Sequence, residues 1–165
     1  MGPDELAERI RQRFPEVLEA RGEVTVTVTP QELTAALGYL RDEEDLSFRF
    51  LSDLTATDWP SQEPRFWIAY HLQSLERAHR VRVKVGLSGD DPHVPTVTPM
   101  FPTANWHERE VFDFFGVVFD GHPDLRRIEM PEGWVGHPLR KDHPLAGVPT
   151  QYKGAFVPPP DQRGV

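Results

Sequence analysis

The residues best suited to chemistry are concentrated in the last third of the chain. Four histidines and five carboxylates there could supply ligands for zinc or iron: His107, His122, His137, His143, Glu108, Glu110, Asp113, Asp124 and Asp142. Their spacing matches no metal motif, and three of the histidines directly precede proline, which favours extended backbone over helical ligand pairs. Histidines that form local hydrogen bonds or face a partner are the favoured interpretation. A metal-dependent hydrolase using His122, His137 and His143 is the alternative.

A short helix must position several of these carboxylates. The sequence predicts that it runs from Asn105 or Trp106 to Phe115, with Gly116 as a left-handed C-cap residue. Asn105 and Glu108 have the spacing of a capping box, which would place them at the helix N-terminus.

Two carboxylates of the same helix could pair for acid–base chemistry. Glu110 and Asp113 can converge on one face, whereas Glu108 and Glu110 point about 200° apart. Ordinary acids favoured by the helix dipole are the preferred interpretation. Arg109 and Asp113, at i and i+4, are expected to form an exposed ion pair.

A basic cluster follows the helix and consists of Arg126, Arg127, Arg140 and Lys141. It could bind phosphate or RNA, but four acids bring residues 121–142 to zero formal charge. Such mixed charge suits either a polar protein interface or a solvated surface. The nearby aromatic run, from Phe112 to Phe119, is expected to pack in the core.

Several classes of function are excluded by what the sequence lacks. It has no cysteine, hence no disulfide and no thiolate-held iron–sulfur cluster, and no GxGxxG, GxxxxGK[ST], HExxH or GxSxG motif. A net charge of −8 argues against nucleic acid and anionic lipid as partners, so a protein partner is expected. No apolar stretch is long enough to cross a bilayer, and the acidic N-terminus is unlike a signal peptide, which predicts a cytoplasmic protein.

The elements that carry these residues follow from periodicity. Helices are expected over about residues 3–14 and 30–40, the second opened by a capping box from Thr29 to Glu32. Strands are expected at 17–18 and 24–28 as a hairpin, and at about 48–58, 66–72 and 81–87. The third strand pattern would place Phe48, Phe50 and Leu54 on one face. The order α-β-β-α-β-β-β predicts an α+β two-layer sandwich with a mixed, mostly antiparallel sheet.

The chain changes character near Asp91. Five prolines precede this point and twelve follow it. We therefore predict a core domain over residues 1–91, a connector, short helix and docking segment over 92–145, and an extended, proline-rich tail over 146–165. Because the part after Gly121 is too apolar for a free tail, it should lie against its own sheet or another subunit.

One long combination of motifs is specific. It begins with the helix sequence Glu108-Arg109-Glu110-Val111-Phe112-Asp113-Phe114-Phe115-Gly116 and continues with Gly121-His122-Pro123-Asp124-Leu125-Arg126-Arg127-Ile128 and Gly136-His137-Pro138-Leu139-Arg140-Lys141-Asp142. This combination resembles the signature of the 30 kDa subunit family of respiratory complex I, the C subunit of NADH:quinone oxidoreductase.

The resemblance implies a structural and assembly subunit of the peripheral arm of a proton-translocating complex. It would have no active site and bind no cofactor itself, although the whole complex uses FMN, iron–sulfur clusters, NADH and quinone. The implied partners are the 49 kDa-type subunit, designated D, and subunits B and I, near the quinone module, on the cytoplasmic side of the bacterial membrane. An equivalent subunit of a hydrogenase-related membrane complex is the near alternative. In either complex we expect charge-assisted hydrogen bonds to hold the short helix and the segment after it together, through Glu108, Arg109, Glu110 and Asp113. The basic residues Arg126, Arg127, Arg140 and Lys141 are expected to reach acids or carbonyl groups of the partner.

Overall fold

The computed structural model describes residues 1–131, 133–144, 150–152 and 155–157. Within these ranges the elements follow one another as α1 (Pro3–Arg11), β1 (Val17–Ala20), β2 (Glu23–Val28), α2 (Leu33–Asp42), β3 (Phe50–Asp58), β4 (Phe66–Ser74), β5 (His79–Leu87), β6 (His93–Pro95), α3 (Ala104–Phe115), β7 (Val118–Asp120), β8 (Thr150–Tyr152) and β9 (Ala155–Val157).

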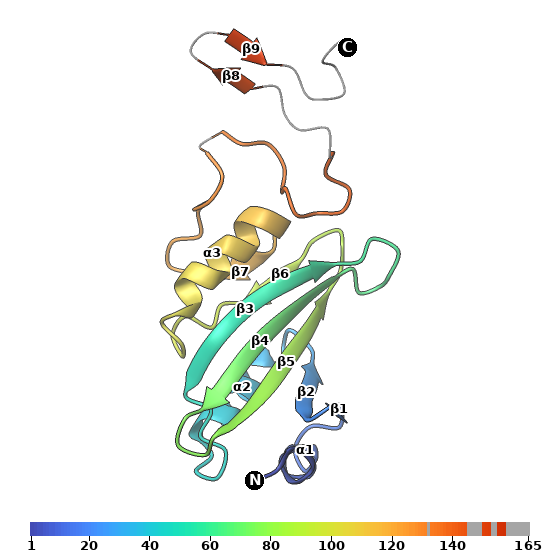
Figure 1. Ribbon diagram of the computed structural model, residues 1–165, viewed down its shortest axis with the longest axis vertical. Coiled ribbons are helices and arrows are strands. Elements are labelled where there is room, and N and C mark those ends of the chain that lie inside the picture. Colours follow the sequence, from blue (N-terminus) through green and yellow to red (C-terminus); the bar gives the residue numbers. More distant parts are fainter. Residues whose placement is uncertain (132, 145–149, 153–154, 158–165) are drawn as a thin grey trace.

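Strands β1 to β5 form one sheet in the order β1-β2-β5-β4-β3 (Figure 1). All neighbours are antiparallel except β2 and β5, which run parallel because the chain travels through α2, β3 and β4 between them. The prediction of an α+β fold with a mixed, mostly antiparallel sheet is thereby confirmed.

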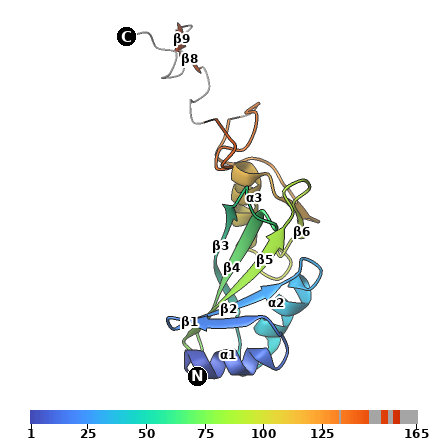
Figure 2. The same ribbon diagram turned by 90° about the vertical axis from the view of Figure 1, so that its right-hand side faces the viewer.

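One face of the sheet carries the hydrophobic core. Alternate residues of the strands point into it, including Val26, Tyr70 and Val83, which lie side by side in register and are fully buried. α1 contributes Leu6, Ala7 and Ile10, while α2 contributes Leu33, Ala36, Leu37 and Leu40. Each buried valine, leucine or isoleucine side chain stabilises the fold by about 1.5 to 3 kcal/mol through the apolar surface it removes from water. Figure 2 shows α2 on this side of the sheet.

The two N-terminal helices are shorter than the periodicity predicts. α1 ends at Arg11, although Phe14 still packs against the core and against the ring of Tyr39. At α2 the Glu32 carboxylate does accept the N–H of Thr29 at 3.0 Å, as in a capping box, but Pro30 lies in a turn and the helix begins at Leu33.

A β-bulge corrects the prediction for β3. The register shifts between Leu51 and Asp53, so Leu51 and Leu54 both face the core although they are three residues apart. Phe50 therefore points to the open face and is exposed, contrary to the simple alternation expected for Phe48, Phe50 and Leu54.

The segment after Asp91 joins the same core rather than only connecting two parts. Val94, Val97 and Phe101 are buried in it, and β6 pairs in parallel with β7. α3 packs against β3, and the orange segment after Gly121 passes over the C-terminal end of α3 (Figure 1). The predicted burial of the aromatic run is confirmed for Phe115 and Phe119.

The tail is described only in part. The backbones of β8 and β9 pair with each other, and the remainder of the predicted tail, like Leu145, lies outside the described residues. Among the described helices, none has the length and apolar character needed to cross a membrane.

Candidate functional site

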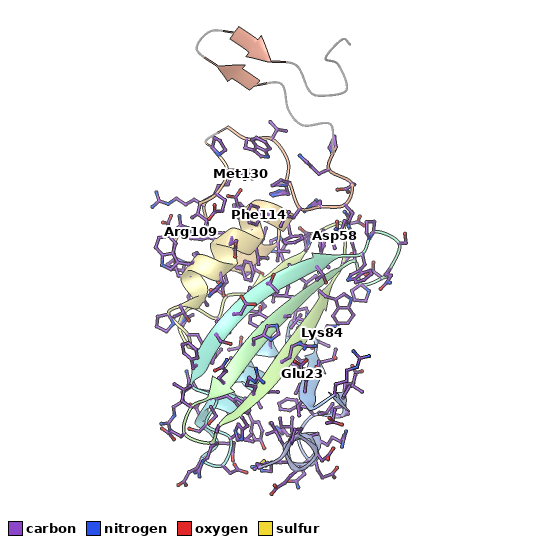
Figure 3. The ribbon with its side chains drawn as sticks, viewed as in Figure 1. Glu23, Asp58, Lys84, Arg109, Phe114 and Met130 are labelled. Atoms are coloured by element: carbon purple, nitrogen blue, oxygen red, sulfur yellow. The ribbon has the colours of Figure 1, made fainter. Side chains whose placement is uncertain are left out.

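The signature residues meet where the C-terminal end of α3, the end of β3 and residues 121–144 come together. Figure 3 shows Arg109 and Phe114 on α3, Met130 on the segment above them and Asp58 at the end of β3. We call residues 121–144 the arm. Three buried carboxylates, Asp113, Asp58 and Glu108, hold this region together.

Asp113 is the anchor of the arm. Its side chain is fully buried, and one carboxylate oxygen accepts the backbone N–H groups of Ile128, Glu129 and Met130 at 2.8 to 3.0 Å. The other oxygen accepts a hydrogen bond from Nη1 of Arg127 at 2.7 Å. Burial alone would raise the pKa of Asp113, but the three N–H groups and the guanidinium outweigh it and hold that pKa below its ordinary value. The carboxylate thus stays charged and fixes the turn after Arg127.

The second Gly-His-Pro motif satisfies the carbonyl groups that the end of α3 leaves free. The Asp113 carbonyl accepts a hydrogen bond from Nδ1 of His137 at 2.9 Å, the Phe114 carbonyl from the N–H of Leu139 at 3.1 Å, and the Phe115 carbonyl from Nε of Arg140 at 2.5 Å. Desolvation lowers the pKa of His137, so its ring is neutral with the proton on Nδ1. Residues 137–140 therefore cap the C-terminal end of α3.

Gly116 allows this cap to approach. Its φ of +73° is left-handed, as the sequence predicts for a C-cap. A Cβ at this position would also lie 2.5 Å from Nε2 of His137 and 2.6 Å from Nη2 of Arg140. Gly116 is thus required both by its backbone conformation and by the side chains packed on it.

Asp58 ties the arm to the sheet. Its buried carboxylate accepts hydrogen bonds from Nε and Nη2 of Arg65 at 2.7 and 2.9 Å and from the N–H of Lys141 at 2.8 Å. Arg65 also donates to Asp142 at 2.8 Å, and the guanidinium groups of Arg65 and Arg140 lie 4.9 and 5.2 Å from the centre of the Phe66 ring. The Arg65 hydrogen bonds lower the pKa of Asp58 although burial opposes them.

The sequence did not identify Asp58 and Arg65 as site residues. Both lie about 80 residues before their partners in the arm, Asp58 at the end of β3 and Arg65 just before β4, and neither belongs to a motif. The only available signal was an aspartate, Asp58, on the inward-facing side of a predicted strand, where a charge requires a partner.

Glu108 is buried in the middle of α3, not at its N-terminus. One oxygen accepts the N–H of Val97 at 2.7 Å and the other accepts the hydroxyl of Thr96 at 2.5 Å. Burial raises its pKa from 4.5 to about 7, against the effect of these two hydrogen bonds. The capping box predicted with Asn105 is wrong, because α3 begins at Ala104 and Glu108 binds the connector instead.

The ring of His122 lies beside Glu108, and burial together with the charge of Glu108 raises the pKa of the Tyr70 hydroxyl. Nε2 of His122 is 3.8 Å from the carboxylate and 3.2 Å from the carbonyl of Asn105. Since Nδ1 of His122 accepts the N–H of Asp124 at 3.0 Å, the proton of the neutral ring is on Nε2. Within the described part of the chain, the buried hydroxyl of Tyr70 has no hydrogen-bond partner.

The predicted exposed ion pair between Arg109 and Asp113 is also wrong. Arg109 is buried, donates from Nε to the carbonyl of Arg126 at 3.2 Å and stacks over the ring of Trp106 at 4.9 Å. Asp113 uses Arg127 instead, whose Nη2 also reaches the carbonyl of Gly136 at 2.9 Å. The tertiary position of the arm, not the spacing along the helix, decides these pairs.

The other predicted site residues lie around this network. Glu110 is half-buried on α3, Pro123 is exposed, Pro138 is half-buried, and Asp124 pairs with Arg126 at 3.0 Å. The Lys141 side chain is exposed. In the described ranges, no group of three histidines or carboxylates is arranged to hold a metal ion. His122 and His137 bond to separate carbonyl groups, and His143 stacks on Trp134.

Around this network the outer surface is partly apolar. Trp106 is 64% exposed, Arg126 71%, Val135 86% and Leu139 49%. The buried polar groups find their hydrogen-bond partners within the chain, whereas these four side chains face outward. Trp and Arg are enriched in protein interfaces.

Fold and site together define a small α+β domain whose C-terminal arm is locked onto its last helix by buried charges. Residues 26–149 match the family model described as the respiratory-chain NADH dehydrogenase 30 Kd subunit. The chain belongs to this family.

Individual relatives agree with this assignment. The chain is 47% identical over 150 residues to the C subunit of NADH-quinone oxidoreductase from Nocardioides sp., a match covering 90% of this chain and 60% of that relative's length. A solved structure of the trypsin-resistant fragment (1-134) of Nqo5 aligns with a TM-score of 0.65 at 30% identity, covering 76% of this chain and all of that one. A chain of the membrane-bound sulfane sulfur reductase, an archaeal respiratory membrane complex, aligns with a TM-score of 0.69 at 27% identity, covering 86% and 85%.

Proposed function

We propose that the chain is a structural subunit of an NADH:quinone oxidoreductase and that it docks on the 49 kDa-type subunit through the end formed by α3 and the arm. It carries no active site or cofactor of its own and reaches the membrane, on its cytoplasmic side, only through the complex. Electron transfer from NADH through FMN and iron–sulfur clusters to quinone is then the work of other subunits.

The main support for this proposal is that the charged groups of the site form hydrogen bonds within the chain. Asp113, Asp58, Arg127 and Arg140 are all engaged in hydrogen bonds within the chain that fix the arm. The sequence predicts that Arg127 and Arg140 contact a partner; their intrachain bonds favour a positioning role instead. The fixed arm then exposes Arg126, Val135 and Leu139, and α3 exposes Trp106, as preformed contact groups, which lowers the entropic cost of binding.

The proposal is tested by purifying the complex through a tag on another subunit and measuring how much of this chain is retained. Arg126→Ala and Leu139→Ala should each reduce retention, because each removes an exposed group from the contact surface. Matched controls are Arg13→Ala and Leu75→Ala, which truncate exposed residues of the same types elsewhere. Equal retention for the test and control variants would reject this surface as the docking site.

The likeness to the archaeal respiratory complex supports a second host. A subunit with this fold also serves there, so an equivalent role in a hydrogenase-related membrane complex fits the same geometry. Identifying the proteins that co-purify with the chain separates the two hosts, because only an NADH-dependent complex includes a flavoprotein module.

A further inference from the structure

The open face of the five-stranded sheet plays no part in the site described above. The helices lie on the core face, and Figure 2 shows that, among the described elements, none covers the other face. Cross-strand register fixes which side chains meet on it, because paired residues point to the same side. The rows across the sheet are Thr25, Arg82, His71 and Asp53, then Thr27, Lys84, Ala69 and Thr55, then Gly86, Trp67 and Thr57.

The centre of this face is basic. β5 is the middle strand, and its outward residues are Arg80, Arg82 and Lys84, about 6.6 Å apart along the strand. The acids on the face are Glu23, which pairs with Arg82, and Asp53 on the edge strand β3. The face therefore carries a formal charge of +1 in a chain of −8. Figure 3 shows Lys84 and Glu23 on this side of the sheet.

The same face also carries apolar contact groups. The half-buried ring of Trp67 lies beside Lys84, whose Nζ is 4.3 Å from the ring centre. Leu18 on β1 and Phe50 on β3 are exposed toward the same side, since they pair with Thr25 and Gln73. A hollow of about 460 Å³ opens at the Arg80 end, with His71, Arg80 and Arg82 in its lining.

We propose that this open sheet face is a second docking surface, which binds an acidic segment of a neighbouring protein subunit. Acidic side chains would pair with Arg80, Arg82 and Lys84 while an apolar side chain covers Trp67. Five strands of four to nine residues give roughly 600 Å² of sheet, close to the about 800 Å² that each partner buries in a standard interface.

The charge of the face favours an acidic protein segment over a second copy of the chain, a nucleic acid or an anionic membrane. A second copy of the chain would set its own basic strand against this one, and like charges face to face disfavour association. The negative charge of the whole chain opposes nucleic acid and anionic membranes. The inference rests on the proposed function only in that the neighbour belongs to the same complex.

Lysine acetylation tests the proposal, because the two surfaces carry one described lysine each. Lys84 lies on the open sheet face and Lys141 on the arm, while Lys153 lies outside the described residues. The isolated full chain and the purified complex are acetylated in parallel, and mass spectrometry measures the rate at each lysine. We expect the rate at Lys84 to fall by about tenfold in the complex, as for a side chain from which an interface excludes water.

The pattern of protection separates this proposal from the proposed function. Loss of reactivity at Lys141 alone rejects the sheet surface and leaves the arm surface standing. Unchanged reactivity at both lysines rejects both. Protection of Lys84 by phosphatidylglycerol vesicles but not by the complex overturns the assignment to a protein partner.

A charge reversal gives an independent readout. Arg80→Glu with Lys84→Glu should reduce retention of the chain in the complex by about tenfold, because like charges would then meet across the interface. Arg11→Glu with Arg13→Glu is the control, since it changes the charge equally on the exposed part of α1 and beyond its end. Equal retention of the two double variants contradicts the proposal.

Discussion

The raised pKa of Glu108 predicts that this carboxyl group destabilises the fold as the pH rises. The folded protein holds the proton up to about pH 7, whereas the unfolded chain releases it near 4.5. Between these values the folded state binds more protons, so the contribution of Glu108 to the free energy of unfolding falls as the pH rises. At about 1.36 kcal/mol per pKa unit the loss amounts to about 3 kcal/mol by pH 8.

Glu108→Gln isolates this effect. The amide keeps the shape of the neutral acid, its oxygen can accept the N–H of Val97, and its NH₂ can donate to the hydroxyl of Thr96. The variant should therefore match the wild type near pH 5 and exceed it by up to about 3 kcal/mol at pH 8.

Urea unfolding followed by tryptophan fluorescence at pH 5, 6, 7 and 8 measures the difference between variant and wild type. The difference is the useful quantity, because the lowered pKa of His137 contributes a slope of opposite sign that cancels in it. Glu110→Gln, on the same helix but half-buried, is the matched control and should show no such divergence. A difference that stays constant from pH 5 to pH 8 would refute the reasoning.

Three further predictions concern the arm. Asp113→Asn should lower the free energy of unfolding by about 2 to 3 kcal/mol, because the half-buried guanidinium of Arg127 and three backbone N–H groups lose their charged acceptor. Hydrogen exchange at the amides of residues 128–130 should become faster. Gly116→Ala should cost more in urea unfolding than Gly22→Ala, since both glycines have positive φ but only Gly116 has side chains packed against its Cα. Asp58→Asn should cost about 2 kcal/mol at pH 7. Because the pKa of Asp58 is lowered from 3.8, this difference should begin to shrink as the pH falls below about 4 and vanish only below the pKa of the folded state, which acid titration monitored by circular dichroism would detect.

The sequence alone determined the elements whose side chains repeat with a regular period. The alternating valines of β2 and β5, the apolar face of α2 and the left-handed Gly116 were all predictable, because each depends on neighbours within a few residues. The motifs of α3 and the arm were sufficient to indicate the family. They did not show how the individual charged groups would pair.

Only the tertiary structure decided the partners of the charged groups. Arg109 and Asp113 are correctly spaced for an ion pair, yet each bonds to the arm, and Asp58 meets Lys141 from 83 residues away. A buried carboxylate is stable only where donors surround it, and the chain that brings those donors arrives from another part of the fold. Local spacing therefore predicted the helix, and long-range packing decided which hydrogen bonds hold the arm on it.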